Sequence, residues 1–381
     1  METQPDRLDQ EACYRAALTR DARFDGRFFG CVKTTGIYCR PVCPARTPNR
    51  ENMIFVVTAA AAEEAGFRAC LRCRPETAPD MGAWRGTSNT VSRALSLIEQ
   101  GALDAHSESG GDVDTLAGRL GVGERQLRRL FRQHLGAAPV SVAQTRRVLL
   151  AKALIQESDL SMAQVALASG FGSVRRFNET FQALYGRPPS ALRRGKDRVS
   201  DGGVKLSLSY RPPYDCDAMF EALKARAPDQ VRDDRPGSRV WSRELDAAID
   251  GATGRVTATP GQPGRVEVRV EASDLKALPG VLARVRRVFD LSADPEAIAR
   301  DLSADPVLRP LIEARPGLRL PGDWVDAGED APSDRLKDAT LEARAERWRP
   351  WRAYGALYLQ INGLLPIRRL ANGEVGRREA A

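Results

Sequence analysis

The segment from residue 39 to residue 73 begins with Cys39-Arg-Pro-Val-Cys43 and ends with Cys70-Leu-Arg-Cys73. Two close cysteine pairs are typical of a zinc site, because each pair on a tight turn supplies two corners of a tetrahedron. Two disulfides are the alternative, but the rest of the chain has the character of a cytosolic protein, in which disulfides rarely persist. The spacing therefore predicts that Cys39, Cys43, Cys70 and Cys73 bind Zn²⁺.

The residues around both pairs carry a more specific pattern. It reads Lys33-Thr-Thr-Gly-Ile-Tyr-Cys39 before the first pair and Gly66-Phe-Arg-Ala-Cys70-Leu-Arg-Cys73-Arg-Pro75 around the second. This pattern resembles the N-terminal domain of the Ada family of bacterial methyl-phosphotriester repair proteins and transcriptional activators, over about residues 10–79. The resemblance implies that Cys39 is both a metal ligand and the acceptor of the methyl group.

Two arginines lie beside the cysteine pairs. Arg46 follows the first pair and Arg68 precedes the second. Both are candidates to hold DNA phosphates, with ordinary exposed surface arginines as the alternative.

The implied methyl transfer is chemically reasonable for a zinc-bound thiolate. A free thiol with a pKa of about 8.5 is mostly protonated at neutral pH, whereas zinc keeps a cysteine ligand deprotonated. Three further thiolates crowd the metal with negative charge and preserve the nucleophilicity of Cys39. The thioether product leaves poorly, so each molecule is expected to react once. The chain has no Pro-Cys-His motif of the kind that accepts alkyl groups from guanine in classical Ada proteins, so that second activity is not expected.

Composition places few limits on the partners of the chain. Its 381 residues are enough for two or three domains, and 42% hydrophobic residues support folded cores. No apolar run of roughly 18 residues and no signal-peptide core occurs, so we expect a cytoplasmic protein without a membrane span. The balance of 58 basic to 50 acidic residues permits nucleic-acid binding without demonstrating it. The remaining cysteines, Cys13, Cys31 and Cys216, are expected to be core residues.

Residues 88–195 contain two copies of one pattern, a short apolar helix, a glycine turn and a basic helix. The first turn is at Gly121, and the helix after it exposes Arg125, Gln126, Arg128, Arg129 and Arg132. The second turn is Ser169-Gly-Phe-Gly172, and its following helix exposes Ser173, Arg175, Arg176 and Asn178. This is the helix-turn-helix plan, in which arginines of the second helix grip phosphates or read guanine edges. A solvated helix face is the alternative for any single charged run.

The second copy also carries a family pattern. The spacing Ala166-x3-Gly170-Phe171-x-Ser173-x3-Phe177-x3-Phe181-x3-Tyr185-Gly186-x-Pro188-Pro189 resembles the AraC-type DNA-binding domain. The resemblance implies binding of double-stranded DNA at promoter sites, with RNA polymerase as a further partner. The bases that are read do not follow from the sequence.

A different texture follows the polar linker at 195–203. Residues 204–210 alternate as a strand, Met219, Phe220 and Leu223 mark a helix, and residues 254–259 and 265–270 read as a hairpin. Ser273 is expected to cap a helix that runs through Leu278 to Phe289. This block resembles the N-terminal domain of AlkA-like DNA-3-methyladenine glycosylases, and residues 344–358 resemble the last helix of that family.

The catalytic part of that glycosylase family is missing between these two stretches. Base excision needs a hairpin that holds a DNA phosphate and a carboxylate near the sugar, which the family supplies from a Leu-Pro-Gly-x-Gly hairpin and a downstream aspartate. Leu278-Pro-Gly280 and Leu320-Pro-Gly322 lack the second glycine. Asp323 and Asp326 lie close to the point where the catalytic part is missing, and neither is expected to be catalytic. We therefore expect no glycosylase active site.

The predicted fold is multidomain α+β. Its parts are a zinc-binding, methyl-acceptor domain at 1–82, a double helix-turn-helix domain at 88–195, a small α/β domain at 203–290 and a truncated helical tail at 291–381. Because the tail lacks the middle of its domain, an apolar face is left without its usual partners (Trp348, Trp351, Tyr354 and Leu357). Residues 323–381 are therefore expected to be poorly packed or to lie against the small α/β domain. The predicted function is phosphotriester repair coupled to transcriptional activation. A working glycosylase with regulatory domains and a plain transcription factor with a structural zinc remain the alternatives.

Overall fold

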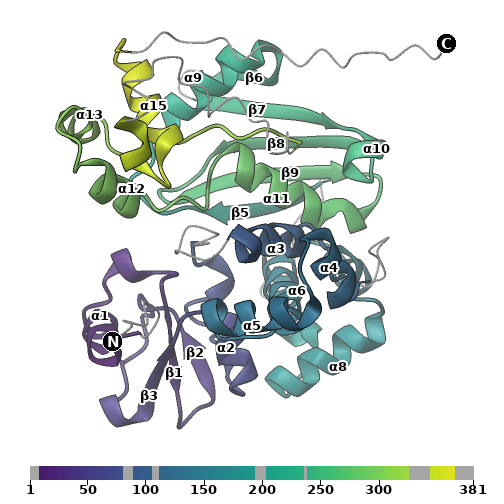
Figure 1. The fold of residues 1–381 in the computed structure, drawn as a ribbon. Helices are drawn as coiled ribbons and strands as arrows, with labels where there is room; N and C mark the ends of the chain where they lie inside the picture. The colour runs from purple at the N-terminus through teal and green to yellow at the C-terminus, as the bar shows by residue number, and fades with distance from the viewer. Residues whose placement is uncertain are drawn as a thin grey trace.

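The computed structural model describes residues 8–79, 89–104, 111–193, 203–235, 238–325 and 344–364. The predicted linker at 195–203 falls mostly outside these ranges, as does Asp326. Figure 1 shows an N-terminal α/β unit and a helical unit side by side, beneath a larger unit built on a five-stranded sheet. The multidomain α+β class is confirmed. Among the described residues, no helix combines the length and the apolarity that a membrane span requires.

The N-terminal unit is a four-stranded sheet flanked by two helices. Strand order is β3-β1-β2-β4, with β1 Phe29–Val32, β2 Ile37–Cys39, β3 Met53–Val56 and β4 Arg68–Ala69. Its helices are α1 (Gln10–Thr19) and α2 (Ala59–Glu64), and its 3₁₀ turns are η1 (Ala22–Phe24), η2 (Arg50–Asn52) and η3 (Pro75–Thr77). Cys13 and Cys31 are buried in its two small cores, as predicted.

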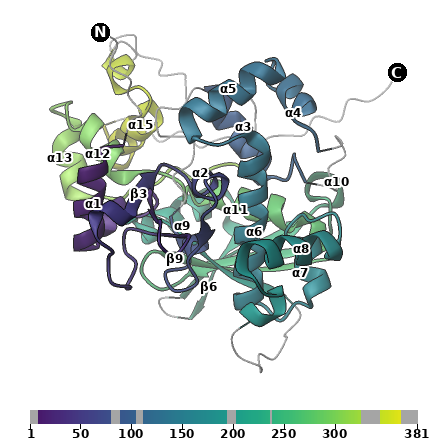
Figure 2. The ribbon, with the colours of Figure 1, turned by 90° about the horizontal axis from the view of Figure 1, so that it is seen from below.

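The helical unit contains both predicted helix-turn-helix copies. Its helices are α3 (Asn89–Glu99), α4 (Val113–Arg119), α5 (Glu124–Leu135), α6 (Pro139–Glu157), α7 (Met162–Ala168) and α8 (Val174–Tyr185). The 3₁₀ turn η4 (Pro189–Leu192) follows. The two turns place Gly121 and Gly170 at φ +69° and +90°, a backbone conformation that side chains disfavour. The long helix α6 lies between the two copies (Figure 2).

The third unit is built on an antiparallel sheet of order β5-β9-β8-β7-β6. The strands are β5 Val204–Ser209, β6 Val231–Arg235, β7 Ser238–Leu245, β8 Gly254–Pro260 and β9 Arg265–Ala272. Helices α9 (Cys216–Arg226), α10 (Ala247–Asp250) and α11 (Leu278–Val288) accompany it, with 3₁₀ turns η5 (Pro228–Gln230) and η6 (Leu275–Ala277). The hairpin predicted at 254–270 is confirmed by the register of β8 and β9.

One sequence prediction for this unit needs correction, and two of its strands were missed. Asp274, and not Ser273, caps the 3₁₀ turn η6 that leads into α11, and the Ser273 hydroxyl instead accepts from the Thr253 amide at 3.0 Å. The strands β6 and β7 were not predicted, because their sequence is too polar to show alternation. A turn signal, Pro236-Gly237, stands between them in the sequence and marks them as a hairpin candidate.

The described part of the C-terminal tail is well packed, so the first expectation, poor packing, is wrong. The second expectation, contact with the small α/β domain, is met by Tyr354, whose hydroxyl donates to Asp290. Helices α12 (Pro295–Leu302) and α13 (Leu308–Ala314) form a core with η9 (Glu346–Trp348) and α15 (Arg352–Ile361). Trp348, Trp351 and Tyr354 are buried there. The two indole N–H groups donate to Asp305 and Asp301, each at 2.9 Å, which satisfies their polar atoms.

The units share apolar surface. One continuous core joins the second helix-turn-helix copy (Phe177, Phe181) to the inner face of the five-stranded sheet (Leu206, Leu208). Strand β5 contacts α6, and α11 contacts α3. The third unit is thereby packed against the helical unit.

Candidate metal centre and nucleic-acid interface

The sheet of the N-terminal unit brings the two cysteine pairs together. Strands β2 and β4 run parallel with Tyr38 opposite Ala69, and the Cys70 amide donates to the Tyr38 carbonyl at 3.0 Å. Cys39 is the last residue of β2 and Cys70 follows the last residue of β4. Because the two strands are parallel, both cysteines lie at the same end of the sheet. A turn closed by a hydrogen bond from the Cys43 amide to the Arg40 carbonyl then adds the second cysteine of the first pair.

The resulting cluster has the donor set of a four-thiolate metal site. The Sγ atoms of Cys39, Cys43, Cys70 and Cys73 all lie within 4.8 Å of one another. A zinc tetrahedron with bonds of about 2.3 Å has edges of about 3.8 Å, so the cysteines need only a small contraction to fit the ion. Cys70 and Cys73 are buried, whereas Cys39 and Cys43 are partly exposed. The residues present therefore fit a metal site in which the protein supplies all four ligands and two of these ligands, Cys39 and Cys43, are partly exposed to solvent.

Backbone amides treat the four sulfurs differently. The Arg40 amide donates to Cys73 Sγ at 3.4 Å, and the Arg72 amide donates to Cys70 Sγ at 3.3 Å. The Ala45 amide lies close enough to Cys43 to lower its pKa.

The thiols also perturb one another. A hydrogen bond from Cys39 lowers the pKa of Cys43 to about 7, while hydrogen bonds to Cys43, Cys70 and Cys73 raise the pKa of Cys39. Four thiolates this close repel one another, so full ionisation of the cluster requires a cation. The other cysteines differ in kind, because burial raises the pKa of Cys13 and of Cys216 to about 11, and that of Cys31 to about 12. Cys216 is only partly buried, less than predicted.

The two arginines predicted beside the cluster have different surroundings. Arg46 is exposed. Arg68 is half-buried, and its guanidinium carbon lies 5.9 Å from the ring centroid of Tyr185 at the end of α8. Arg68 thus contacts the helical unit from the metal-binding unit.

The recognition helices of both copies carry their predicted basic faces toward solvent. Arg125, Arg128 and Arg129 on α5 are exposed, as are Arg175 and Arg176 on α8. Two of these are engaged within their helices, since Arg128 pairs with Glu124 at 2.5 Å and Arg175 with Glu179 at 2.8 Å. Ser173 is the N-cap of α8, because its hydroxyl accepts from the Arg176 amide at 3.1 Å.

Two glutamates of α2, Glu63 and Glu64, form contacts between the metal-binding and helical units that were not predicted from the sequence. The Glu63 carboxylate on α2 accepts from Tyr38 at 3.0 Å and from Thr145 of α6 at 2.7 Å. Burial raises the pKa of Glu63. Glu64 accepts from the Ala138 amide at 2.8 Å and also pairs with Arg132. No local pattern marks these residues, since a lone glutamate on a short helix usually faces solvent.

The glycosylase-like motifs do not form the hairpin of that family. Leu278-Pro-Gly280 opens the helix α11, with Pro279 in its first turn. At the second motif, the Gly322 amide donates to the Val288 carbonyl at 3.1 Å, and a Cβ at Gly322 would lie 2.4 Å from the Arg287 carbonyl oxygen. Asp323 lies 3.4 Å from Arg226 in an exposed ion pair.

Three stretches of the chain match known domain families. Residues 12–76 match the metal binding domain of Ada, residues 116–195 match a helix-turn-helix domain, and residues 205–325 match the AlkA N-terminal domain. A Mycobacterium tuberculosis protein named probable bifunctional transcriptional activator/DNA repair enzyme AlkA is 41% identical over 329 residues. That alignment covers 85% of this chain and 64% of the relative, so the chain spans less than two thirds of the relative's length.

Further similarity is concentrated in the N-terminal half. The Escherichia coli bifunctional transcriptional activator/DNA repair enzyme Ada is 30% identical over 193 residues, which is 51% of each chain. The refined structure of the DNA methyl phosphotriester repair domain of E. coli Ada is 44% identical, over 20% of this chain and 80% of that chain, with a TM-score of 0.18. The crystal structure of the methylated N-Ada/DNA complex is 33% identical, over 37% and 99%, also with a TM-score of 0.18.

Proposed function

We propose that this chain, which carries an Ada-type metal-binding domain, an AraC-type helix-turn-helix domain and an AlkA N-terminal domain, transfers methyl groups from DNA phosphotriesters to Cys39 and activates transcription. The observation that carries the proposal is the cluster of four cysteines beside a DNA-binding fold, with Cys39 at its open side. The metal is Zn²⁺, held by Cys39, Cys43, Cys70 and Cys73, and when bound it keeps the cysteine sulfurs deprotonated at neutral pH.

Cys39 is favoured as the nucleophile by two features. Its side chain is partly exposed, whereas Cys70 and Cys73 are buried. A backbone N–H that donates to a sulfur draws electron density from it, and Cys70 and Cys73 both accept such bonds. Cys43 shares the exposure of Cys39 but has the Ala45 amide beside it. The exposure of Cys39 and the amide bonds to Cys70 and Cys73 thus favour Cys39, the acceptor position that the resemblance to the Ada family implies.

The reaction is a single displacement. The Cys39 sulfur attacks the methyl carbon, the bond from that carbon to the phosphotriester oxygen breaks, and the diester leaves with the electron pair as an ordinary phosphate anion. Exposed Arg46 supports the departing charge. Because the thioether does not regenerate the thiolate, each chain turns over once.

DNA is contacted in two ways in this proposal. Arg125, Arg128, Arg129, Ser173, Arg175 and Arg176 face the helix-turn-helix target, while Arg46 and Arg68 serve the metal-binding domain. RNA polymerase is the proposed partner at promoters. The part related to AlkA is proposed to lack base-excision activity, because its two Leu-Pro-Gly motifs open a helix and line a packed segment.

The test uses a short duplex with one methylphosphotriester. After incubation, mass spectrometry of a digest is expected to locate one added methyl group on the peptide that contains Cys39. Cys216→Ala, outside the cluster, is the matched control and should react like the wild type. Cys39→Ala should accept no methyl group. Methylation of another cysteine in the wild-type protein would assign the nucleophile elsewhere. If no cysteine were methylated, the zinc would have a structural role only.

A parallel assay addresses the alternative activity. Duplex DNA treated with a methylating agent is incubated with excess protein, and free 3-methyladenine is measured. We expect none above background. Release that is abolished by Asp323→Asn would make the protein a working glycosylase.

A further inference from the structure

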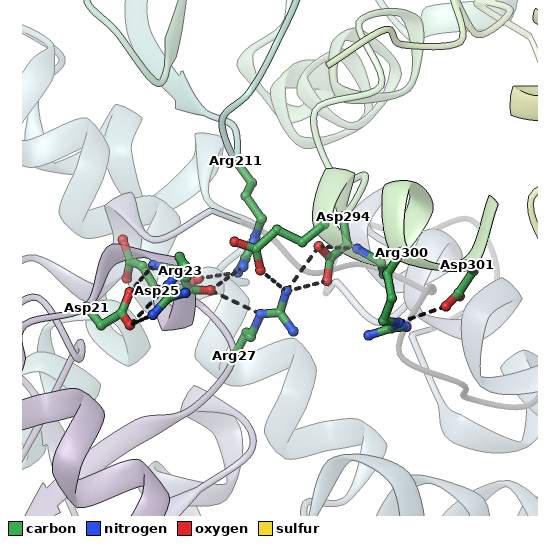
Figure 3. Close-up of polar contacts among 10 residues, drawn as sticks. Asp21, Arg23, Asp25, Arg27, Arg211, Asp294, Arg300 and Asp301 are labelled. Atoms are coloured by element: carbon green, nitrogen blue, oxygen red, sulfur yellow. Dashed lines mark hydrogen bonds and ion pairs between the residues drawn. The ribbon is translucent and has the colours of Figure 1, made fainter. Parts of the chain in front are cut away.

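The AlkA-like domain contacts the metal-binding domain at residues 23–25, the segment just before strand β1. Arg211, which follows β5 and is 3% exposed, donates from Nη1 to the Arg23 carbonyl at 2.5 Å and from Nη2 to the Asp25 carbonyl. Figure 3 shows Arg211 reaching down from the third unit between Asp25 and Asp294. The Arg211 carbonyl in turn accepts from the buried Arg319 at 2.6 Å, which fixes the backbone at Arg211.

The carboxylate of Asp25 continues this contact toward the cysteines. Its two oxygens accept from Nε of Arg40 at 2.8 Å and from Nη2 of the same guanidinium. Asp25 and Arg40 have side chains that are 9% and 15% exposed, so the pair is largely removed from water. A bidentate arginine–carboxylate pair of this kind holds one geometry.

Arg40 spans the two cysteine pairs. It lies within the Cys39–Cys43 loop, and its Nη1 donates to the Cys73 carbonyl at 3.2 Å and to the Thr77 hydroxyl at 2.7 Å. Its own amide donates to Cys73 Sγ. One guanidinium therefore ties the loop of the first pair to the loop of the second.

The AlkA-like domain holds the far side of this bridge as well. The Ser209 hydroxyl, at the end of β5, donates to the Thr77 carbonyl at 2.8 Å. Ser209 and Arg211 are two residues apart and contact the two segments, Thr77 and Asp25, that grip Arg40. A second ion pair, from Arg27 to Asp294 at 3.0 Å and to Glu296 at 2.8 Å, holds the same face (Figure 3).

We propose that Arg211 and Ser209 of the AlkA-like domain are positioning residues for the metal centre, acting through Asp25, Thr77 and Arg40. The domain related to a glycosylase thus serves the methyl-acceptor site by holding its two cysteine loops at a fixed separation. Partners that orient metal ligands change metal affinity by about 10–100-fold when they are removed. The proposal rests on the proposed function only for its effect on methyl transfer, since the effect on the metal is independent of any reaction.

The experiment uses the full-length protein loaded with Co²⁺ or Zn²⁺. We expect Arg40→Met to accelerate zinc release to a colorimetric chelator by roughly 10–100-fold, and Arg211→Met to accelerate it by about tenfold. The sulfur-to-cobalt absorption band should shift or broaden in both variants. Arg211→Lys, which keeps a donor but loses the fork, should restore part of the difference.

Arg300→Met is the matched control. Arg300 lies in the same interface region, but its guanidinium pairs with Asp301 on its own helix at 2.8 Å (Figure 3). Its zinc release and cobalt spectrum should match the wild type, as should promoter binding by all variants. Ser209→Ala, which removes a single hydroxyl, is expected to accelerate zinc release about two- to threefold and replaces Arg211→Met if that variant does not fold.

The outcomes separate the two proposals. Arg211→Met that behaves like Arg300→Met in both metal measurements overturns the positioning role, as does an unchanged Ser209→Ala when Arg211→Met cannot be purified. A wild-type protein that never accepts a methyl group overturns the proposed function alone. If transfer occurs, Arg211→Met should lower its rate at saturating DNA while leaving the DNA concentration for half-saturation unchanged.

Discussion

The ammonium group of Lys152 lies 2.7 Å from a carboxylate oxygen of Glu76, and both side chains are almost fully buried, at 0% and 1% exposed. Lys152 belongs to α6 of the helix-turn-helix domain, and Glu76 to the turn that follows the last cysteine. Glu76 also pairs with Arg74 at 3.2 Å, and Arg74 pairs with Glu157 at 2.6 Å. The metal-binding and helix-turn-helix domains therefore meet through a desolvated ion pair, which fixes their relative orientation.

Breaking this pair should destabilise the protein. Lys152→Met leaves a buried carboxylate with only Arg74 beside it, which is expected to cost about 3–5 kcal/mol of unfolding free energy. The measurement is urea denaturation followed by tryptophan fluorescence and circular dichroism. Arg128→Met, which removes an exposed pair with Glu124, should cost less than about 1 kcal/mol. Equal costs for the two variants would contradict a structural role for the buried pair.

Metal should be part of the folding free energy of the N-terminal domain. We predict about one zinc per chain, because its small cores otherwise have no cross-link. Cys73→Ala should unfold residues 10–79 while residues 90–195 stay folded, which hydrogen exchange can resolve. Stoichiometric metal binding that survives Cys43→Ala and Cys73→Ala together would refute the four-cysteine assignment.

The recognition arginines should separate into two groups. Arg129 and Arg176 are exposed and form no ion pair within the described residues, so each is free to contact a phosphate or a base. Replacing either with Ala should weaken promoter binding and reduce the slope of log affinity against log salt by about 1 if its contact is to phosphate. Arg300→Ala, on the far domain, should leave both unchanged. Affinity that is insensitive to both recognition variants would place the DNA interface elsewhere.

Asp290 should make stability depend on pH. Burial raises the pKa of this carboxyl to about 6, and its neighbours Arg319 and Tyr354 offset only part of that rise. The folded state therefore favours the protonated form, and this contribution is full below about pH 4 and is lost as the pH rises through 6. Relative to Asp290→Asn, the wild type should lose roughly 2–3 kcal/mol between pH 4 and pH 7. Parallel pH profiles in urea denaturation would show that Asp290 is not perturbed.

Methylation of Cys39 should strengthen promoter binding. Four thiolates and one zinc carry a formal charge of about −2, and methylating one ligand reduces it to about −1. At an effective dielectric near 20, one charge about 8 Å from a phosphate contributes about 2 kcal/mol, or somewhat more than tenfold in affinity. Fluorescence anisotropy on methylated and unmethylated protein should show a gap that narrows as salt rises. Equal affinities in low salt would mean that repair and regulation are unconnected.

Features encoded within a few residues could be read from the sequence. The paired cysteines, the glycine turns before α5 and α8 and the β8–β9 hairpin all depend on spacing along the chain, because turns and helix faces are set by nearest neighbours. Because thiolates bind zinc well, the two cysteine pairs, Cys39/Cys43 and Cys70/Cys73, then predict a shared metal site.

What only the tertiary structure decided depends on residues far apart. Lys152 and Glu76 are 76 positions apart, and Arg211 and Asp25 are 186 apart. The burial that makes a lysine pair with a glutamate, or an arginine clamp two carbonyls, arises only when separate domains exclude water from one another. The same reason explains the tail, where the sequence suggests that Trp348 and Trp351 form an unpartnered apolar face. In the structure, α12 and α13 supply the apolar surface, and Asp301 on α12 and Asp305 in the turn between the two helices accept the indole N–H groups.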